Sequence, residues 1–315
     1  MTAHLVFGFR RVAVPATIGK KLGILAAGVC CFILAACSTS QAALVSSEPF
    51  AAPAYTVGTE LPTLNPAIAG YTGAWTDVDF GDAEPAVAAG SLDYTDPLYA
   101  PETGNKVGKA ADTAGIGPTT SGRVFRLLDS SLLVNATTSG TRYLSVLFQT
   151  GNENAAPQPD IYSTIALGNG GTSDAQRELY FGIASEAFNL NSPDYAFMVD
   201  NNQTLRSAFG VARDANVHLF VFKFNLSATA LSDSVTAWLD PTLGAGEPAG
   251  GVTFGGVDLT FDRLAISDYA SNSSYWDEIR WGDSFDSVTV VPEPGAMLML
   301  LSGLGILLFC RRTGG

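Results

Sequence analysis

Cysteine is missing from most of this 315-residue chain. The four cysteines all lie near the two ends, at Cys30, Cys31, Cys37 and Cys310. Residues 38–309 can therefore form no disulfide bond, thiolate metal site or cysteine nucleophile. A domain in this region must depend on its apolar core, and roughly 250 residues are enough for one large β domain.

Histidine and basic residues are also scarce. His4 and His218 are the only histidines, so a histidine-based zinc site lacks ligands and a Ser/His/Asp triad would depend on His218. We expect His218 to be structural, because it lies within the clearest strand pattern. Without the two terminal segments, 11 basic and 29 acidic side chains leave a net charge of −18. Such a chain repels nucleic acid, anionic lipid and acidic polysaccharide unless divalent cations bridge them.

Long apolar runs occur only at the two ends. At the N-terminal end, four basic residues precede the apolar segment 22–36, and small residues follow it through Ala43. This order is typical of a secretory signal peptide. Residues 1–43 are therefore predicted to be a signal peptide, which signal peptidase would cut after Ala42 or Ala43.

A second processing site overlaps this segment. The sequence Leu34-Ala35-Ala36-Cys37 resembles the lipobox of bacterial lipoproteins. That resemblance implies a lipid on Cys37, which would become the first residue of the mature chain. The protein would then be an outer-membrane lipoprotein, an alternative to the soluble exported form.

The C-terminal segment 291–315 has three parts in order: Val291-Pro292-Glu293-Pro294, the apolar run 295–310, and Arg311-Arg312. As a helix, the run would be roughly 24 Å long, a thin membrane span. The two arginines favour the cytoplasmic side, so the preceding chain would lie outside the cytoplasm. The segment resembles the PEP-CTERM sorting signal. This resemblance implies an inner-membrane intermediate, processing by an exosortase at the Pro-Glu-Pro motif, and release to the cell surface or extracellular matrix.

Between the two ends the pattern is that of an all-β protein. As a strand, 217–226 would carry large residues on both faces for most of its length, which predicts a central strand. Short runs bounded by Gly, Asn, Asp, Ser and Pro predict nine further strands, at 124–128, 143–148, 161–167, 178–183, 195–199, 208–211, 234–239, 264–266 and 277–281. About ten short strands without an amphipathic helix predict a sandwich or jelly roll. The segment 83–121 has few strong apolar positions and is predicted to be loop and edge strand.

Two stretches resemble concanavalin A-like, laminin G-like domains. Val235-Thr236-Ala237-Trp238-Leu239-Asp240-Pro241 is similar to their strand-and-turn element, and Trp276-Asp277-Glu278-Ile279-Arg280-Trp281-Gly282 is similar to their closing strand. The similar part covers about 120–290. It implies a laminin G-like jelly-roll β-sandwich, which we place at 44–290. Asp240 stands where Asn is frequent, and either side chain meets the backbone needs of a turn.

The sequence does not support catalysis. Glycoside hydrolysis needs two carboxylates that flank one bond, whereas adjacent Asp277 and Glu278 would point to opposite faces of a regular strand. We expect one of them to pair with Arg280 or to cap a turn. A polysaccharide hydrolase or lyase is therefore disfavoured, and the protein is predicted to be non-enzymatic.

Calcium and sugars are the remaining candidate ligands. Asp77, Asp79 and Asp82 carry hard oxygen donors, as does 200–202, but neither spacing is diagnostic and ordinary turn acids explain both. Four aromatic residues would stack on sugar rings if they were exposed: Tyr71, Trp75, Tyr94 and Tyr99. The alternative function is thus a calcium-dependent, lectin-like module. The main prediction is an exported, non-enzymatic surface or matrix protein without a cofactor, associated with exopolysaccharide or biofilm.

Overall fold

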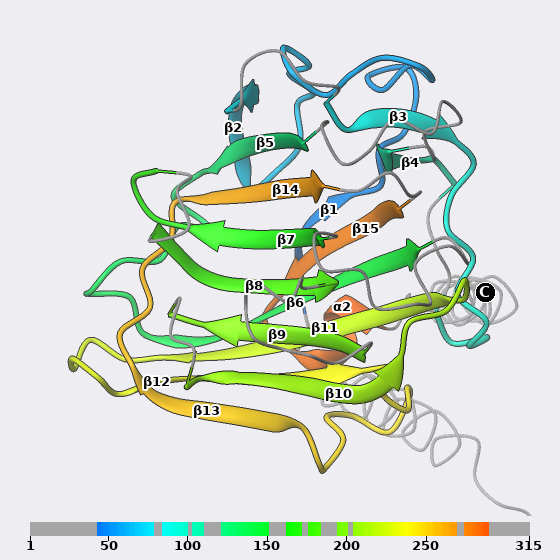
Figure 1. The fold of residues 1–315 in the computed structure, drawn as a ribbon. Coiled ribbons are helices and arrows are strands. Elements are labelled where there is room, and N and C mark those ends of the chain that lie inside the picture. The colour runs from blue at the N-terminus through cyan, green and yellow to red at the C-terminus, as the bar shows by residue number, and fades with distance from the viewer. Residues whose placement is uncertain are drawn as a thin grey trace, which may run out of the picture. The chain divides into compact units, whose positions relative to one another are not determined.

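Contacts divide the chain into two units, 1–41 and 42–315, and every residue described here belongs to the second. The computed structural model describes residues 43–78, 84–99, 103–109, 121–150, 162–171, 176–183, 194–200, 204–269 and 274–289. These residues form two antiparallel sheets that face each other (Figure 1).

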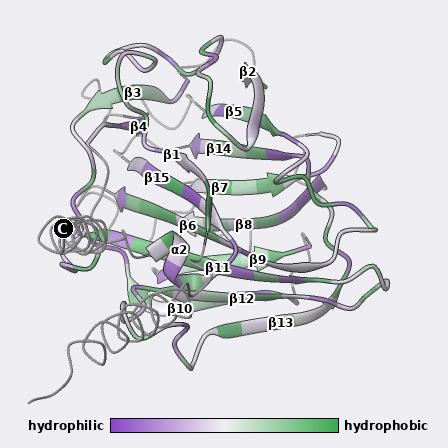
Figure 2. Cartoon of the chain, turned by 180° about the vertical axis from the view of Figure 1, so that it is seen from behind, coloured by the Kyte–Doolittle hydropathy of each residue, from purple (hydrophilic) through white to green (hydrophobic). Residues whose placement is uncertain are grey.

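The eight-stranded sheet has the order β13-β12-β11-β6-β15-β4-β3, and β1 also pairs with β15. Its strands are β1 (Leu44–Glu48), β3 (Ala86–Ala89), β4 (Asn105–Lys109), β6 (Gly140–Thr150), β11 (Val217–Leu226), β12 (Asp233–Leu239), β13 (Val252–Val257) and β15 (Ser274–Gly282). A five-residue helix, α2 (Phe285–Thr289), follows β15. Seen from behind, α2 lies over this sheet, and it contacts β6 and β15 (Figure 2).

The seven-stranded sheet has the order β10-β9-β8-β7-β14-β5-β2. Its strands are β2 (Tyr71–Asp77), β5 (Ser121–Leu128), β7 (Tyr162–Gly168), β8 (Arg177–Ile183), β9 (Asp194–Val199), β10 (Arg206–Ala212) and β14 (Arg263–Tyr269). Both sheets also pair strands that are distant in the sequence, as in β6 with β15 and β5 with β14. The architecture is a jelly-roll β-sandwich, which confirms the predicted fold class.

An aromatic core joins the two sheets. Phe148 and Trp276 of the eight-stranded sheet lie with ring centroids 4.0 Å apart. Phe181 of the seven-stranded sheet packs against Phe222 at 4.4 Å. Each buried aromatic removes roughly 150–250 Å² of surface from water. This packing stabilises a region that has no cysteine for a disulfide bond.

A second core covers the outer face of the eight-stranded sheet. Leu219 and Val221 of β11 point into it, whereas Phe220 and Phe222 belong to the core between the sheets. Residues before β4 and in α2 close it from outside. Strand β11 is therefore buried on both faces between β12 and β6, as its sequence predicts, and its bounds match the prediction.

The predicted loop and edge region 83–121 contains β3 and β4, and β3 ends the strand order of its sheet. No bounds were predicted for five strands, although two of them lie in the region predicted to contain edge strand: β1, β2, β3, β4 and β13. Their sequences are short, polar or rich in glycine, so tertiary pairing rather than apolar alternation forms them. Within the described ranges, no helix is long and apolar enough to cross a membrane.

Candidate functional site

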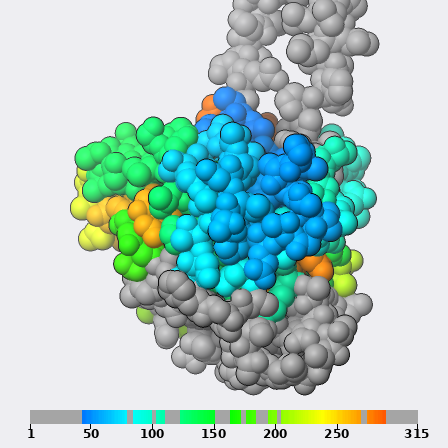
Figure 3. Space-filling model, turned by 90° about the horizontal axis from the view of Figure 1, so that it is seen from above, coloured from blue at the N-terminus to red at the C-terminus, as the bar shows by residue number. Residues whose placement is uncertain are grey.

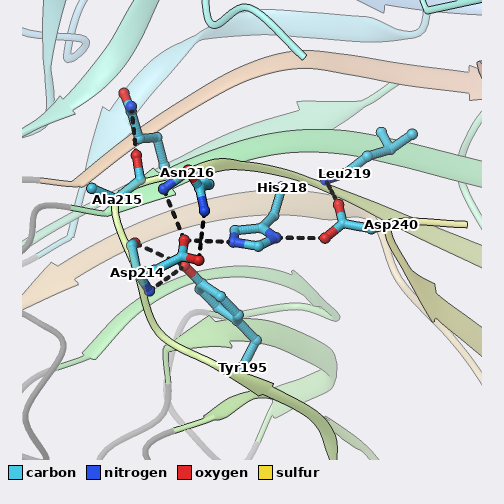
Figure 4. A network of polar contacts seen from close by, with 8 residues as sticks. Tyr195, Asp214, Ala215, Asn216, His218, Leu219 and Asp240 are labelled. Carbon is cyan, nitrogen blue, oxygen red and sulfur yellow. Dashed lines mark hydrogen bonds and ion pairs between the residues drawn. The ribbon is translucent and has the colours of Figure 1, made fainter. Parts of the chain in front are cut away.

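A polar network lies where β11 begins (Figure 4). His218 is buried between two carboxylates. Its Nδ1 lies 2.6 Å from Asp240 Oδ2, and its Nε2 lies 2.9 Å from Asp214 Oδ1. Because each ring nitrogen faces a carboxylate, the doubly protonated imidazolium ring satisfies both partners.

Local backbone geometry places the two acids. Asp214 forms an Asx-type turn, with the Asn216 backbone N–H donating to Asp214 Oδ1 at 2.8 Å. Asp240 follows β12 with a φ of 49°, a left-handed conformation that short polar side chains tolerate. Its Oδ1 accepts the Leu219 N–H at 2.9 Å, so the carboxylate bridges the start of β11 and the end of β12.

The electrostatics favour a charged histidine. Burial alone would lower the pKa of His218, but hydrogen bonds and charge from Asp240 and Asp214 outweigh burial and raise the pKa. At Asp214, burial alone would raise the pKa, but the hydrogen bonds from His218 and Asn216 and the charge of His218 together outweigh burial and lower the pKa. A catalytic triad needs one imidazole nitrogen to face a nucleophile. Here both nitrogens are held by carboxylates, which is the geometry of a structural ion pair.

This network also connects the two sheets. Tyr195 on β9 donates its hydroxyl to the Asp214 carbonyl at 3.2 Å, and its ring centroid lies 4.6 Å from that of His218. Tyr94, in the loop before β4, forms a hydrogen bond with Asp240. Burial, together with the charge of Asp240 and this hydrogen bond, raises the pKa of Tyr94 above its usual value. The network therefore fixes loops at one end of the sandwich.

A second cluster surrounds the two adjacent acids of β15. The Glu278 carboxylate pairs with Arg280, at 2.8 Å from Nη2 and 2.9 Å from Nε, which confirms the predicted pairing. Asp277 accepts the Leu92 N–H at 2.8 Å and so anchors the preceding loop. Burial is the main reason that the pKa of Asp277 rises to about 8. Both carboxylates are buried and already partnered.

The predicted opposite orientation of Asp277 and Glu278 is wrong. The register of β15 shifts between Asp277 and Arg280, and Glu278 has a φ of 51°. Such a β-bulge breaks the alternation of side chains. Both carboxylates act on the same hydroxyl group, because their charges add to the burial that raises the pKa of Tyr99. The centroid of the Tyr99 ring lies 4.5 Å from the Arg280 guanidinium carbon.

A third cluster is an ion pair in the interior that the sequence did not indicate. Glu48 on β1 accepts Arg126 Nη1 of β5 at 3.1 Å and the Tyr55 hydroxyl at 2.7 Å. Burial outweighs these partners and raises the pKa of Glu48 to about 7. Glu48 and Arg126 are 78 positions apart, so no local spacing signals their contact.

The candidate sugar-stacking aromatics are mostly internal. Tyr71, Trp75 and Tyr99 are buried, so these three rings fill the core and are not available to stack on sugars. Trp75 donates its Nε1–H to the Tyr55 hydroxyl at 3.0 Å. Tyr94 is half-buried and packs edge-on against Tyr99, at 5.6 Å between centroids. These rings stabilise the fold rather than face solvent.

The calcium candidates are only partly described. Asp77 is half-buried in β2, whereas Asp79, Asp82 and 201–202 lie outside the described residues. Asp200 lies close enough to Glu178 to add to the burial that raises the pKa of Glu178 to about 7. In the part of the chain that the structure describes, no three His, Cys, Asp or Glu side chains form a metal-binding group.

The processing signals also lie outside the described residues. This applies to the sorting motif Val291, Pro292, Glu293 and Pro294, to Arg311 and Arg312, and to the alternative lipidation site Cys37. The predicted signal peptide is outside as well, except for Ala43. These assignments stay predictions from the sequence.

No protein-family model and no curated protein matches this sequence. Among solved structures, the chain is similar to the globular domain of T. cruzi calreticulin, with 12% identity, a TM-score of 0.42, and coverage of 68% of this chain and 85% of that one. It is similar to the catalytic domain of a glycoside hydrolase family 131 protein from Coprinopsis cinerea, with 15% identity, a TM-score of 0.42, and coverage of 78% and 97%.

A third similar structure is the binding domain of botulinum neurotoxin serotype D, with 8% identity and a TM-score of 0.42. The alignment covers 83% of this chain, which spans about half (51%) of that binding domain. Identities and TM-scores this low carry no information on ligand or activity.

Proposed function

We propose that this is an exported, non-enzymatic protein of the cell surface or extracellular matrix, sorted through its C-terminal Pro-Glu-Pro motif. The main support is the match between folded elements and predicted processing signals. Among the described residues, the first strand begins at Leu44, directly after the predicted signal peptide, and the last element, α2 (Phe285–Thr289), lies just before the sorting motif at Val291. An intact sandwich thus fits between the two predicted cuts.

Three buried carboxylates support a non-enzymatic protein, because each is held in a structural contact. Glu278 is neutralised by Arg280, Asp277 holds a backbone N–H, and Glu48 pairs with Arg126. A glycosidase instead needs two carboxyl groups that face a substrate. The partners we propose are signal peptidase and exosortase during processing, and exopolysaccharide or other surface proteins afterwards.

The alternative is a calcium-dependent carbohydrate-binding module. The burial of Tyr71, Trp75 and Tyr99 favours the surface-protein proposal over it, because these rings are committed to the core. A rise in Tm on addition of calcium, together with retention on a glycan column, would favour the lectin-like alternative.

The sorting proposal is tested in the native host by replacing Pro292, Glu293 and Pro294 with alanine. Intact mass should show a wild-type chain that ends near the motif in the surface or medium fraction. The variant should keep its tail through Gly315 and stay in the membrane, because an exosortase would have no motif to bind.

Asp286→Ala is the matched control, because Asp286 is exposed on α2 close to the motif but outside it. It should be processed like the wild type. A motif variant that is cut like the wild type would contradict the proposal, because the motif would then not be what the enzyme recognises. A wild-type chain that keeps its tail through Gly315 in the membrane would also contradict it and indicate a plain membrane anchor. Fatty-acid labelling that disappears in Cys37→Ser would indicate the lipoprotein instead.

A further inference from the structure

The first described residue lies against the last turn before α2. The Ala43 backbone N–H donates to Asp283 Oδ1 at 2.9 Å, and the Asp283 N–H donates to the Ala43 carbonyl at 3.3 Å. Strand β1 continues this pairing, with Leu44 opposite Gly282. In Figure 3, the deep-blue start of the described chain lies beside orange atoms from near its end.

The sequence around Ala43 distinguishes two possible cuts. Signal peptidase sites have small residues one and three positions before the cut bond. A cut after Ala42 places Ala42 and Ser40 at those positions, and both are small. A cut after Ala43 places the larger Gln41 at the third position. The sequence therefore favours the Ala42–Ala43 bond, the same bond that would release the nitrogen facing Asp283.

We propose that hydrolysis of the Ala42–Ala43 bond creates an α-ammonium group that docks on the Asp283 carboxylate. One water molecule is consumed, leaving a carboxylate on Ala42 and an ammonium on Ala43. The uncut chain offers Asp283 a single neutral amide donor. The cut chain offers a cation with three N–H donors at the same place, and charge-assisted hydrogen bonds are stronger than neutral ones.

Other cuts would not create this contact. A cut after Ala43 removes the residue that pairs with Asp283 and leaves the amino group on Leu44. Lipidation at Cys37 leaves six residues, 37–42, before Ala43, so its nitrogen stays a neutral amide. A cut beyond Leu44 would shorten β1, whose Ser46 and Glu48 are buried.

The mature fold would thus contain a contact that only cleavage of the signal peptide creates. This contact holds the new N-terminus beside the end of β15, from which the chain continues through α2 toward the sorting motif. This inference rests on the proposed function, because it requires an exported chain with a cleaved signal peptide.

The first test is the N-terminus of the full-length gene product recovered from its native host, read by intact mass and by N-terminal peptide labelling. Ala43 is the expected first residue. An exported chain that begins at Leu44 or at a lipidated Cys37 would overturn the docking and leave export intact. An uncut chain in the cytoplasm would overturn the proposed function and the docking together.

The second test is the pKa of the α-amino group, measured by NMR after reductive ¹³C-methylation of the recovered protein. Only three lysines remain in the mature sequence, Lys106, Lys109 and Lys223, so the α-amine signal can be resolved. In the wild type its pKa should exceed the ordinary ~7.7–8.0 and should fall by about half a unit or more in Asp283→Asn.

Asp286→Asn is the control, because it removes a nearby exposed carboxylate outside the Ala43 contact. It should leave the α-amino pKa within about 0.2 unit of the wild-type value. Equal values in the wild type and Asp283→Asn would show that the amino group does not dock there and would overturn the proposal.

Discussion

Single carboxylates anchor loops to strand ends in this protein. Asp240 accepts the Leu219 N–H, and Asp277 accepts the Leu92 N–H. Asp233 accepts two backbone donors, from Ser227 at 2.7 Å and from Leu259 at 2.8 Å. Removing such an acceptor leaves a backbone donor unsatisfied, at a cost of about 1–3 kcal/mol where the donor is buried. The acidic composition therefore has a structural use beyond solubility.

The pKa of His218 tests whether its two carboxylate partners keep the imidazole charged. His4 lies in the predicted signal peptide, so the mature protein has one imidazole to follow by NMR. Its pKa should lie above the ordinary value of about 6.5, because two carboxylates hold its nitrogens. Stabilisation from this group should be complete below about pH 6.5 and should disappear as pH rises through the raised pKa.

Asp240→Asn and Asp214→Asn should each lower the pKa of His218. The effect should be larger for Asp240, because its 2.6 Å contact is shorter and it is less exposed than Asp214, at 33% against 41% of side-chain surface. A wild-type pKa at or below 6.5 would contradict this account. An unchanged pKa in Asp240→Asn would also do so.

At the scale of elements, β15 organises the sandwich. It pairs with β6, β4 and β1, and its Trp276 packs into the core between the sheets. The opposite sheet leaves room for this ring at Gly182 of β8. A Cβ atom built there would lie 2.8 Å from Trp276 Cη2 and 2.4 Å from the Ser163 carbonyl oxygen. Close packing of the two sheets thus requires glycine at this position.

Gly182→Ala should destabilise the fold by about 2–4 kcal/mol, the sum of backbone strain at a φ of 127° and overpacking. Gly210→Ala is the matched control, because Gly210 also has a positive φ, 73°, but no atom lies within 4 Å of its added Cβ. It should cost only about 1–2 kcal/mol. Denaturant unfolding measures both, and equal losses would show that Trp276 does not require the glycine.

At the scale of the whole molecule, buried carboxyl groups bind protons more tightly than an unfolded chain does. Burial is the main cause of these raised pKa values, which reach about 7 for Glu48, Glu178 and Asp268 and about 8 for Asp277. Other acids have pKa values held below their usual range by hydrogen bonds that outweigh burial: Asp129, Asp214, Glu247 and Asp262. The acids with raised pKa values change the stability of the fold above about pH 4–5, and the acids with lowered pKa values change it below that range.

Stability should therefore be greatest near pH 4–5 and should decline toward pH 8. Above about pH 4, the native state holds protons on the raised groups that the unfolded chain has released, so the free energy of unfolding falls as pH rises. Below about pH 4, the stabilisation from the lowered groups is lost. Thermal unfolding of the mature protein from pH 3 to 9 measures this. A Tm that stays flat or rises between pH 5 and 8 would contradict it.

Several parts of the fold and site followed from local sequence patterns. The alternation in 217–226 predicted a buried central strand, and the short spacing predicted that Asp277 or Glu278 pairs with Arg280 or caps a turn. The polar strand β4 and the pair Glu48 and Arg126 were not predictable, because their partners are remote in the chain. The role of the aromatic residues stayed open at the level of sequence, because large rings suit either a core or a binding surface and only their neighbours decide between the two.

The sequence by itself determined the all-β class, the exclusion of disulfide bonds within 38–309 and the predicted processing signals, because composition and short-range periodicity reflect local backbone preference and burial. Only the tertiary structure decided which carboxylates became buried acceptors, where β15 bulges, and that Ala43 meets Asp283. These depend on contacts between residues up to 240 positions apart. Such contacts form when whole sheets pair and pack, so no local pattern in the sequence encodes them.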